Sequence, residues 1–382
     1  MFKKYRELLS IETILKDAYN YDFNGNMKEL LKEDFIDLEG NGVDALMWFT
    51  YEGERYLFKP LREAKINVWG EILSSYLAEY LNIPHAEYRI ASFNGQLGVV
   101  TKSIIKGKEK LILGSEIFQE FMNRYPYKEK NEILIQNKLF RYLYDIPEEF
   151  LKLNAYDRKR YLFNYLNNLD CIQSIIYNFE DIDRQDKQEI INGLVKTFLF
   201  DIITMQYDRH PNNWGIIVDK KARFSPLFDN STSFGLNYLI IEEHIMEFKR
   251  NILSYYKDAL IRGIDPEDNR REIIYPSEPT LVVNTDDSID PMKKIKKKIP
   301  DVFEHFLNIS SKEDCEFAIQ MVSSVSSDLI EKLIRQAEED NYMKMDSDTC
   351  NYILTLFDNH LEILNSIIET YRRTQDENAR RK

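Results

Sequence analysis

The alternation of hydrophobic and polar positions changes twice along the chain, near residue 34 and near residue 105. Between residues 34 and 105, short apolar runs separated by turn residues predict the order strand, strand, strand, helix, strand, strand. Two of these strands are expected at Leu46–Thr50 and Arg55–Lys59. Apolar residues then recur every three to four positions from Val68 to Leu81, the period of an amphipathic helix. This part of the chain is predicted to form a small β-rich lobe.

Helical periodicity dominates after residue 105 and is interrupted once. Trp214–Val218 and Phe224–Phe228 are predicted as two short strands around a DKKA turn, and Ser310 with Glu313 suggests a helix-capping box farther on. The pattern predicts an α+β fold with three parts: a short helical N-terminal extension (1–33), the β-rich lobe (34–105) and a larger helical lobe (106–382).

Composition sets limits on the class of protein. The 382 residues are 43% hydrophobic, enough for two folded lobes, and the formal net charge of −13 argues against a general nucleic-acid-binding surface. Three widely spaced cysteines fit a reducing compartment. No apolar run approaches the ~20 residues that span a bilayer, and the N-terminus has no signal-peptide core. We expect a cytoplasmic protein, with a secreted effector as the alternative.

The stretch MQYDRHPNNWGIIV places polar side chains between a predicted helix and a predicted strand. Asp208 and Asn213 lie five residues apart, and Asp229 follows the second short strand, so a hairpin would bring all three to one end. Transfer of a γ-phosphoryl group from ATP needs Mg²⁺, oxygen ligands for it, and an acceptor that orients the incoming hydroxyl. Asn213 and Asp229 suit the metal, and Asp208 suits the hydroxyl. The pair Asp208 and Asn213 alone would be explained by an ordinary helix–strand turn.

The β-rich lobe carries further residues that this chemistry requires. Lys59 closes a strand in YLFKP and Glu71 lies in the first turns of the next predicted helix. A strand lysine oriented by a helix glutamate, and reaching the phosphates of ATP, is the arrangement of protein kinases. Gly40 and Gly42 lie between the first two strands, where a phosphate-covering loop belongs, although a simple hairpin turn explains them about as well.

Taken together, YLFKP, the helical GEI, YDRHPNNWGII and PLFDNSTSFG resemble the HipA-like serine/threonine kinases of bacteria, in matching order from about residue 35 to 235. The resemblance implies a two-lobed, protein-kinase-like fold in which Lys59 binds ATP phosphate, Asp208 is catalytic, and Asn213 and Asp229 hold Mg²⁺. His210 occupies the place where many kinases keep a phosphate-contacting lysine. Its expected role is to lie near the γ-phosphate or to brace the loop.

Two departures from HipA concern partners and control. Only about 30 residues precede the first strand, which leaves an interface for an antitoxin-like partner unsupported. The loop GNGVDALMW has no Ser or Thr, which weakens self-control by phosphorylation of that loop. The layout looks more like stand-alone HipA-like kinases, including secreted ones. For autophosphorylation, the best candidates are the hydroxyls of Ser231–Ser233.

Two other functions share these motifs. The D-R-H-x-x-N loop also resembles that of phosphatidylinositol kinases, but Glu242, Glu243 and Glu247 in the segment after Asp229 disfavour an anionic lipid headgroup. A nucleotide-binding pseudokinase is the third alternative, and the presence of every acidic and amide group that the chemistry needs argues against it. We therefore predict an ATP- and Mg²⁺-dependent kinase that acts on protein serine or threonine.

Overall fold

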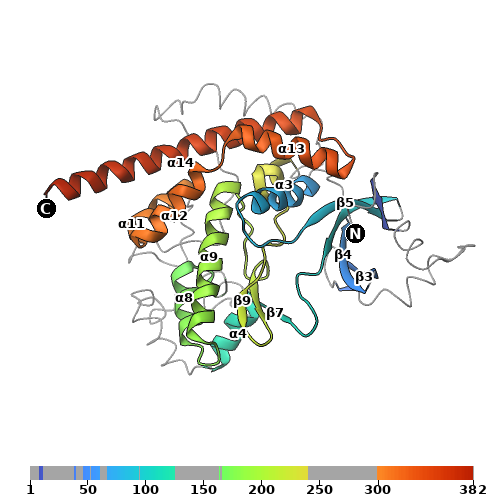
Figure 1. The fold of residues 1–382 in the computed structure, drawn as a ribbon, viewed down its shortest axis with the longest axis horizontal. Helices are drawn as coiled ribbons and strands as arrows, with labels where there is room; N and C mark the ends of the chain where they lie inside the picture. Colours follow the sequence, from blue (N-terminus) through green and yellow to red (C-terminus); the bar gives the residue numbers. More distant parts are fainter. Residues whose placement is uncertain are drawn as a thin grey trace, which may run out of the picture. The chain divides into compact units, whose positions relative to one another are not determined.

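The computed structural model describes residues 8–11, 38–39, 46–51, 53–60, 67–93, 95–124, 163, 166–239 and 299–381 (Figure 1). Two compact units share the chain, and neither is continuous in sequence. Unit 1 comprises Met1–Lys106, Pro226–Glu272 and Ser326–Asp358, and unit 2 comprises Gly107–Ser225, Ile273–Val325 and Asn359–Lys382.

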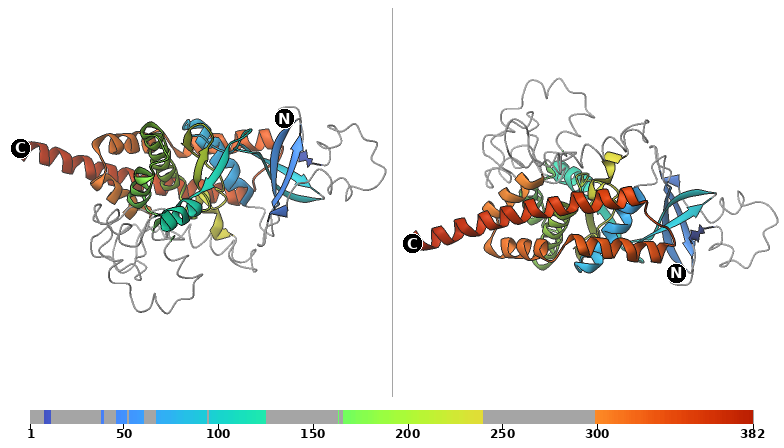
Figure 2. Two further views of the ribbon diagram at one scale, coloured as in Figure 1. Left: turned by 90° about the horizontal axis from the view of Figure 1, so that it is seen from below. Right: turned by 90° about the horizontal axis from the view of Figure 1, so that it is seen from above.

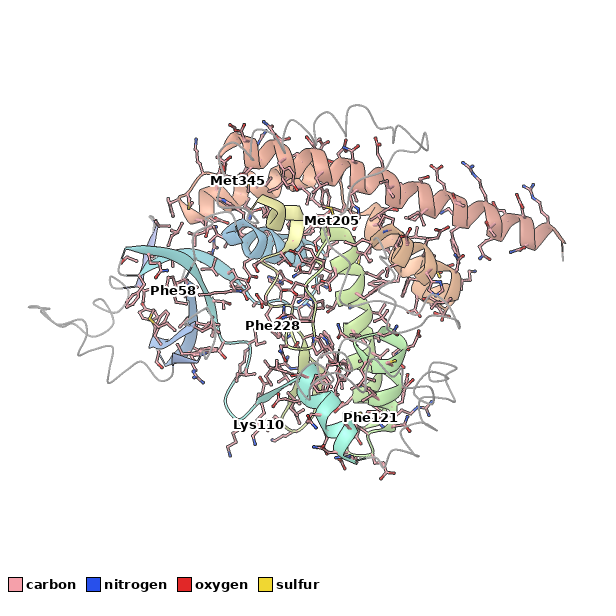
Figure 3. The ribbon with its side chains drawn as sticks, turned by 180° about the vertical axis from the view of Figure 1, so that it is seen from behind. Phe58, Lys110, Phe121, Met205, Phe228 and Met345 are labelled. Atoms are coloured by element: carbon pink, nitrogen blue, oxygen red, sulfur yellow. The ribbon has the colours of Figure 1, made fainter. Side chains whose placement is uncertain are left out.

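Unit 1 contains a six-stranded sheet in the order β1-β5-β6-β4-β3-β2. The strands are β1 (Leu9–Ser10), β2 (Leu38–Glu39), β3 (Leu46–Tyr51), β4 (Glu54–Pro60), β5 (Tyr88–Phe93) and β6 (Gln96–Lys102). All pairs are antiparallel except β1 with β5. Alternate residues of β4 are buried, as expected for a sheet with one covered face. Phe58, labelled in Figure 3, packs edge-on against Phe93 there.

The helix α3 (Asn67–Tyr80) is the central helix of unit 1, and its residues 68–78 are all buried. It ends where Asn82 adopts the left-handed conformation (φ 54°), which stops a helix by closing its last carbonyls. Around α3 lie β5 and β6, the 3-10 segment η3 (Ser233–Leu239), and α13 (Ser327–Asn341). Figures 1 and 2 show α3 and α13 side by side. The α14 helix (Ser347–Arg381) begins in unit 1 and continues into unit 2.

Unit 2 combines a three-stranded sheet with helices. The sheet has the order β7-β8-β9, with β7 at Lys110–Leu113, β8 at Gly215–Val218 and β9 at Ala222–Phe224. Its helices are α4 (Gly114–Arg124), α8 (Leu169–Asn178), α9 (Arg184–Thr204), α11 (Ile299–Ile309) and α12 (Lys312–Ser323). Residues 197–204, the C-terminal part of α9, are all buried, because α8, α11, α12 and β9 pack around this helix. This explains why its hydrophobic positions extend beyond a single face.

The structure confirms the predicted α+β architecture and corrects several details. β9 ends at Phe224 instead of Phe228, because Pro226 has no N–H and the Leu227 backbone bonds the turn after α3. β7 was missed, since a four-residue strand leaves too short a pattern. Leu9–Ser10 form a strand where helix was predicted.

A further correction concerns the start of α12. Ser311, not Ser310, caps this helix, and its side chain accepts a hydrogen bond from the Asp314 N–H. Within the part of the chain that the structure describes, no helix is long and apolar enough to cross a membrane.

Candidate active site

In unit 1, three predicted site residues lie in contact. The Lys59 ammonium donates to Glu71 Oε1 at 3.3 Å and to Asp229 Oδ1 at 2.5 Å. Lys59 closes β4, Glu71 lies in the second turn of α3, and Asp229 is 170 residues farther along the chain from Lys59. The fold therefore gathers one cation and two carboxylates from three separate elements.

Glu71 joins α3 to the segment that carries Asp229. Its second oxygen, Oε2, accepts the Asn230 N–H at 2.7 Å, so each carboxylate oxygen has a strong partner. Gly70 makes this approach possible, because a Cβ at that position would lie 2.4 Å from the Ser231 carbonyl oxygen. A glycine is required where the helix backbone and the loop backbone come this close.

The electrostatics of this cluster follow from burial and from charge pairing. Burial opposes the charged form of Lys59, but the carboxylates of Glu71 and Asp229 outweigh it and raise the Lys59 pKa above its ordinary value. Burial raises the pKa of Glu71, while the ammonium of Lys59 opposes that shift. The Lys59 side chain stays 27% exposed and that of Asp229 36%, whereas Glu71 is only 2% exposed. Lys59 and Asp229 are therefore accessible to a ligand, whereas Glu71 is buried and acts through its contact with Lys59.

The backbone around Asp229 is fixed by unit 1. Leu227 donates its N–H to the Pro84 carbonyl and accepts that of Ala86, both at 2.8 Å, which fastens the segment to the turn after α3. Phe228, labelled in Figure 3, follows. Asp229 has φ 54°, and its N–H donates to the Tyr88 hydroxyl at 3.3 Å. A non-glycine residue in this left-handed region is uncommon and is concentrated at functional sites.

In unit 2, Asp208, His210 and Asn213 lie on one loop between α9 and β8. The helix α9 stops because Met205, labelled in Figure 3, takes the left-handed conformation (φ 55°). Asn213 is buried to 5% exposure, and its Nδ2 donates to the Asp208 carbonyl at 2.7 Å. Because the amide NH2 group can only donate, Oδ1 is the atom of Asn213 that could coordinate a cation.

A buried ion pair holds this loop to α9. The Arg209 guanidinium donates to both oxygens of Asp201, at 3.0 and 2.8 Å, and to the Asn213 carbonyl at 2.9 Å. Burial raises the pKa of Asp201, and the guanidinium opposes that shift. Asn167 completes the support: its Nδ2 donates to the Arg209 carbonyl, and its Oδ1 accepts the indole N–H of Trp214. The polar loop is thus rigidly braced.

His210 belongs to the same bracing. Its Nδ1 accepts the Asn212 N–H at 3.2 Å, and its carbonyl accepts the Asn213 N–H at 2.8 Å. With Nδ1 as an acceptor, the neutral ring carries its proton on Nε2. Bracing the loop was one of the two expected roles of His210, and both roles stay predictions.

Sequence reasoning missed several residues that shape these sites. Arg209, Asp201 and Asn167 were not singled out, and neither was Tyr88. Only Arg209 gave a local signal, as a charged residue inside a loop bordered by apolar runs. The partners of these residues lie up to 141 positions away, and no sequence spacing reveals them. Gly40 and Gly42 lie outside the described residues, as do the three glutamates of the segment after residue 239.

The hydroxyls proposed for autophosphorylation differ in their exposure. Thr232 and Ser233 are buried, whereas Ser231 is partly exposed. In this conformation Ser231 is therefore the accessible one of the three. Among the residues that the structure describes, no group of three or more His, Cys, Asp or Glu side chains could hold a metal by itself.

Comparison with solved structures identifies the fold. The crystal structure of a Helicobacter pylori proinflammatory kinase, CtkA, superposes with a TM-score of 0.56 at 15% sequence identity, covering 89% of this chain and 95% of that one. The chain has a kinase-like fold. HipA from the toxin–antitoxin complex of Shewanella oneidensis MR-1 with HipB and operator DNA matches with a TM-score of 0.44 at 10% identity, over 96% of this chain and 74% of that one.

Sequence comparisons give no further information. No known protein family matches this chain, and none of the curated proteins does. The predicted kinase-like fold is confirmed by the structural similarity to CtkA.

Proposed function

We propose that this protein is a kinase that transfers the γ-phosphoryl group of ATP to a serine or threonine hydroxyl of a protein, with Mg²⁺ as cofactor. The observation that carries the proposal is the contact of Lys59 with both Glu71 and Asp229 in unit 1. A lysine that would bind phosphates, a glutamate that orients it, and an aspartate that would bind metal are three parts that phosphoryl transfer requires. The named kinase with the same fold supports this assignment.

The available donor groups fit a magnesium ion. Mg²⁺ prefers carboxylate, amide and water oxygens, and it is usually held by one or two protein groups together with the phosphates of the nucleotide. The partly exposed Asp229 carboxylate and Oδ1 of Asn213 are donors of this kind. When bound, the ion would supply neutralisation of the phosphate charge.

Each protein residue would then have a defined role. Lys59 would bind ATP phosphate oxygens, held at its position by the buried Glu71. Asp208 would orient the acceptor hydroxyl and take its proton as the new bond from oxygen to the γ-phosphorus forms. The bond between the γ-phosphorus and the bridging oxygen breaks, ADP leaves with that electron pair, and the acceptor becomes a phosphate ester.

The rigid loop of unit 2 suits this mechanism. Arg209 and Asn167 hold the backbone that follows Asp208, at the Asn213 and Arg209 carbonyls, which limits movement of the loop that carries its carboxylate. Because Arg209 donates to both oxygens of Asp201 and to the Asn213 carbonyl, contacts within unit 2 hold this loop together.

The test follows the labelled γ-phosphate of ATP, with Mg²⁺ present, into three acceptors: the protein itself, casein, and phosphatidylinositol vesicles. We expect labelling of protein, and a loss of about 10³-fold in Asp208→Asn and in Asp229→Asn. The matched control is Asp219→Asn, on the exposed turn between β8 and β9, which should keep full activity.

Two results would contradict the proposal. Labelling confined to phosphatidylinositol would make the protein a lipid kinase. ATP binding without transfer to any of the three acceptors would make it a nucleotide-binding pseudokinase.

A further inference from the structure

Glu71 and Tyr76 of helix α3 make polar contacts on different faces of the helix. Glu71 points to Lys59 and to the Asn230 backbone. Tyr76 follows five residues later, and at 100° per residue it lies about 140° around the helix from Glu71. The contacts of Tyr76 are therefore made with a different part of unit 1.

Those contacts are with α13, from the C-terminal part of the chain. The Tyr76 hydroxyl donates to Asp340 Oδ2 at 2.6 Å and accepts from Arg89 Nη1 of strand β5 at 2.8 Å. Arg89 also lies 3.7 Å from the Asp340 carboxylate. Hydrogen bonds to a charged group are the strong ones, and a single carboxylate here joins α3 and β5.

The next residue of α13 binds the strand backbone. Asn341 is buried to 3% exposure; its Oδ1 accepts the Ile90 N–H at 2.8 Å, and its Nδ2 donates to the Ala337 carbonyl at 2.7 Å. The helix then stops at Tyr342 (φ 51°). The Met345 N–H, from the connection labelled in Figure 3, donates to Glu338 Oε1. The C-terminal end of α13 is thus fixed in one position between α3 and β5.

The opposite side of α3 leaves no room for displacement. Gly70 lies against the Ser231 carbonyl, and both oxygens of Glu71 are engaged. A rotation or shift of α3 would break the Lys59–Glu71 contact. Such a movement of α3 could occur only if the hydrogen bond between Tyr76 and Asp340 were broken.

We propose that α13 positions helix α3 for the candidate active site. The contact of Asp340 with Tyr76 holds α3 so that Glu71 stays between Lys59 and Asn230. This inference rests on the proposed function for its consequence in catalysis. Its structural part concerns unit 1 alone and can be measured without any activity.

The first measurement is hydrogen exchange of the full-length protein, followed in peptides from residues 67–80 and 227–236. We expect Tyr76→Phe and Asp340→Asn each to speed exchange in both peptides by about tenfold, since each removes a hydrogen bond to a charged or strongly polarised group. Exchange at Asn230 is the direct report, because its N–H is bound by Glu71. The control is Tyr177→Phe, which removes an exposed tyrosine hydroxyl bound to Gln188 on another helix pair and should change neither peptide.

The second measurement is a double-mutant cycle on phosphoryl transfer. Tyr76→Phe should lower kcat several-fold in the natural protein but cause no further loss in Glu71→Gln, because Tyr76 acts through Glu71. A purely structural role would give the same loss in both backgrounds.

The outcomes separate the two proposals. Unchanged exchange in both Tyr76→Phe and Asp340→Asn, or equal losses of kcat in both backgrounds, would overturn the role of α13. If the natural protein showed no transfer activity, the proposed function would be overturned. Hydrogen exchange would then decide only whether α13 positions α3.

Discussion

Two ion-paired clusters of this molecule, one in each unit, are built differently. In unit 1, the side chains of Lys59 and Asp229 are 27% and 36% exposed, so either can exchange its partner for a ligand. In unit 2, Arg209 and Asp201 are 1% and 6% exposed and form a two-bond contact. Solvent-accessible charge marks where a ligand would bind, whereas the buried pair holds a loop in place.

The two clusters also differ in the free-energy cost of desolvating their charges. Burying an ion pair has a large desolvation penalty, which good geometry offsets only in part, so such a pair is weak evidence for net stability. Breaking it by removing one partner is nevertheless severe, because the other charge stays buried. Four measurements test how the partly exposed cluster of unit 1, the buried pair of unit 2 and their neighbours respond to change, beginning with the largest expected effect.

Replacing Arg209 by Leu should destabilise the protein by about 3–5 kcal/mol, since Asp201 would be left as an unpaired buried carboxylate. Urea unfolding measures the change. The control, Arg223→Leu, removes an arginine whose side chain is 34% exposed and bound to Glu109, and it should cost about 1 kcal/mol or less. Equal losses in the two variants would contradict the distinction between bracing and surface charges.

Replacing Lys59 by Met should lower phosphoryl transfer on the order of 100-fold, the usual loss when one preorganised charge is removed. It should also destabilise the fold, because Glu71 would be buried without its cation. Adding Glu71→Gln should recover stability but not activity. If the double variant regained transfer, Lys59 would be a structural residue.

Acidification should destabilise the protein through His360, whose ring contacts the Ile202 carbonyl on the helix that carries Asp201. Burial lowers the pKa of His360 to about 4. In the unfolded chain the pKa of His360 is near 6.5. The part of the free energy of unfolding that depends on neutral His360 is therefore fully present above that pH, and it falls by about 3 kcal/mol as the pH drops to about 4. Urea unfolding of His360→Gln should show a smaller loss over this range. Equal losses would exclude His360 as the cause.

Adding a methyl group at position 70 should have the smallest effect. A Cβ there would meet the Ser231 carbonyl oxygen, so Gly70→Ala should cost about 1–3 kcal/mol through overpacking, and Gly70→Ser should cost more. Thermal unfolding measures both variants, and transfer activity should fall with them because Glu71 is the neighbouring residue. An alanine variant as stable and as active as the natural protein would contradict the close contact.

Much of the local structure could be predicted from the sequence. The periods of two and of 3.6 residues gave β3, β4 and α3 nearly at their observed bounds, because apolar side chains recur at the spacing of each element, although residues 68–78 of α3 are buried on every face. β9 and β7 could not be predicted well, since three or four residues define no period. The cap of α12 was misplaced by one residue between two adjacent serines, which offer the same chemistry.

In the candidate site, too, some residues could be predicted from the sequence and others could not. The residue types at 59, 71, 208, 213 and 229 led to the prediction of phosphoryl transfer, because that chemistry requires a cation, metal ligands and a proton acceptor in a fixed order along a kinase-like chain. The roles of these residues stay predictions until variants are measured. The supporting residues were not predictable, since Arg209, Tyr88 and Asp340 are ordinary residues in isolation.

The sequence by itself determined which ionisable side chains are present and which segments form helices and strands, since the first follows from residue identity and the second from neighbours a few positions apart. Only the tertiary structure decided that Lys59 contacts Glu71 and Asp229, that Arg209 is buried against Asp201, and that α13 reaches back to α3. Such contacts join residues 8 to 264 positions apart. They depend on how the faces of separate elements pack, which no local pattern records.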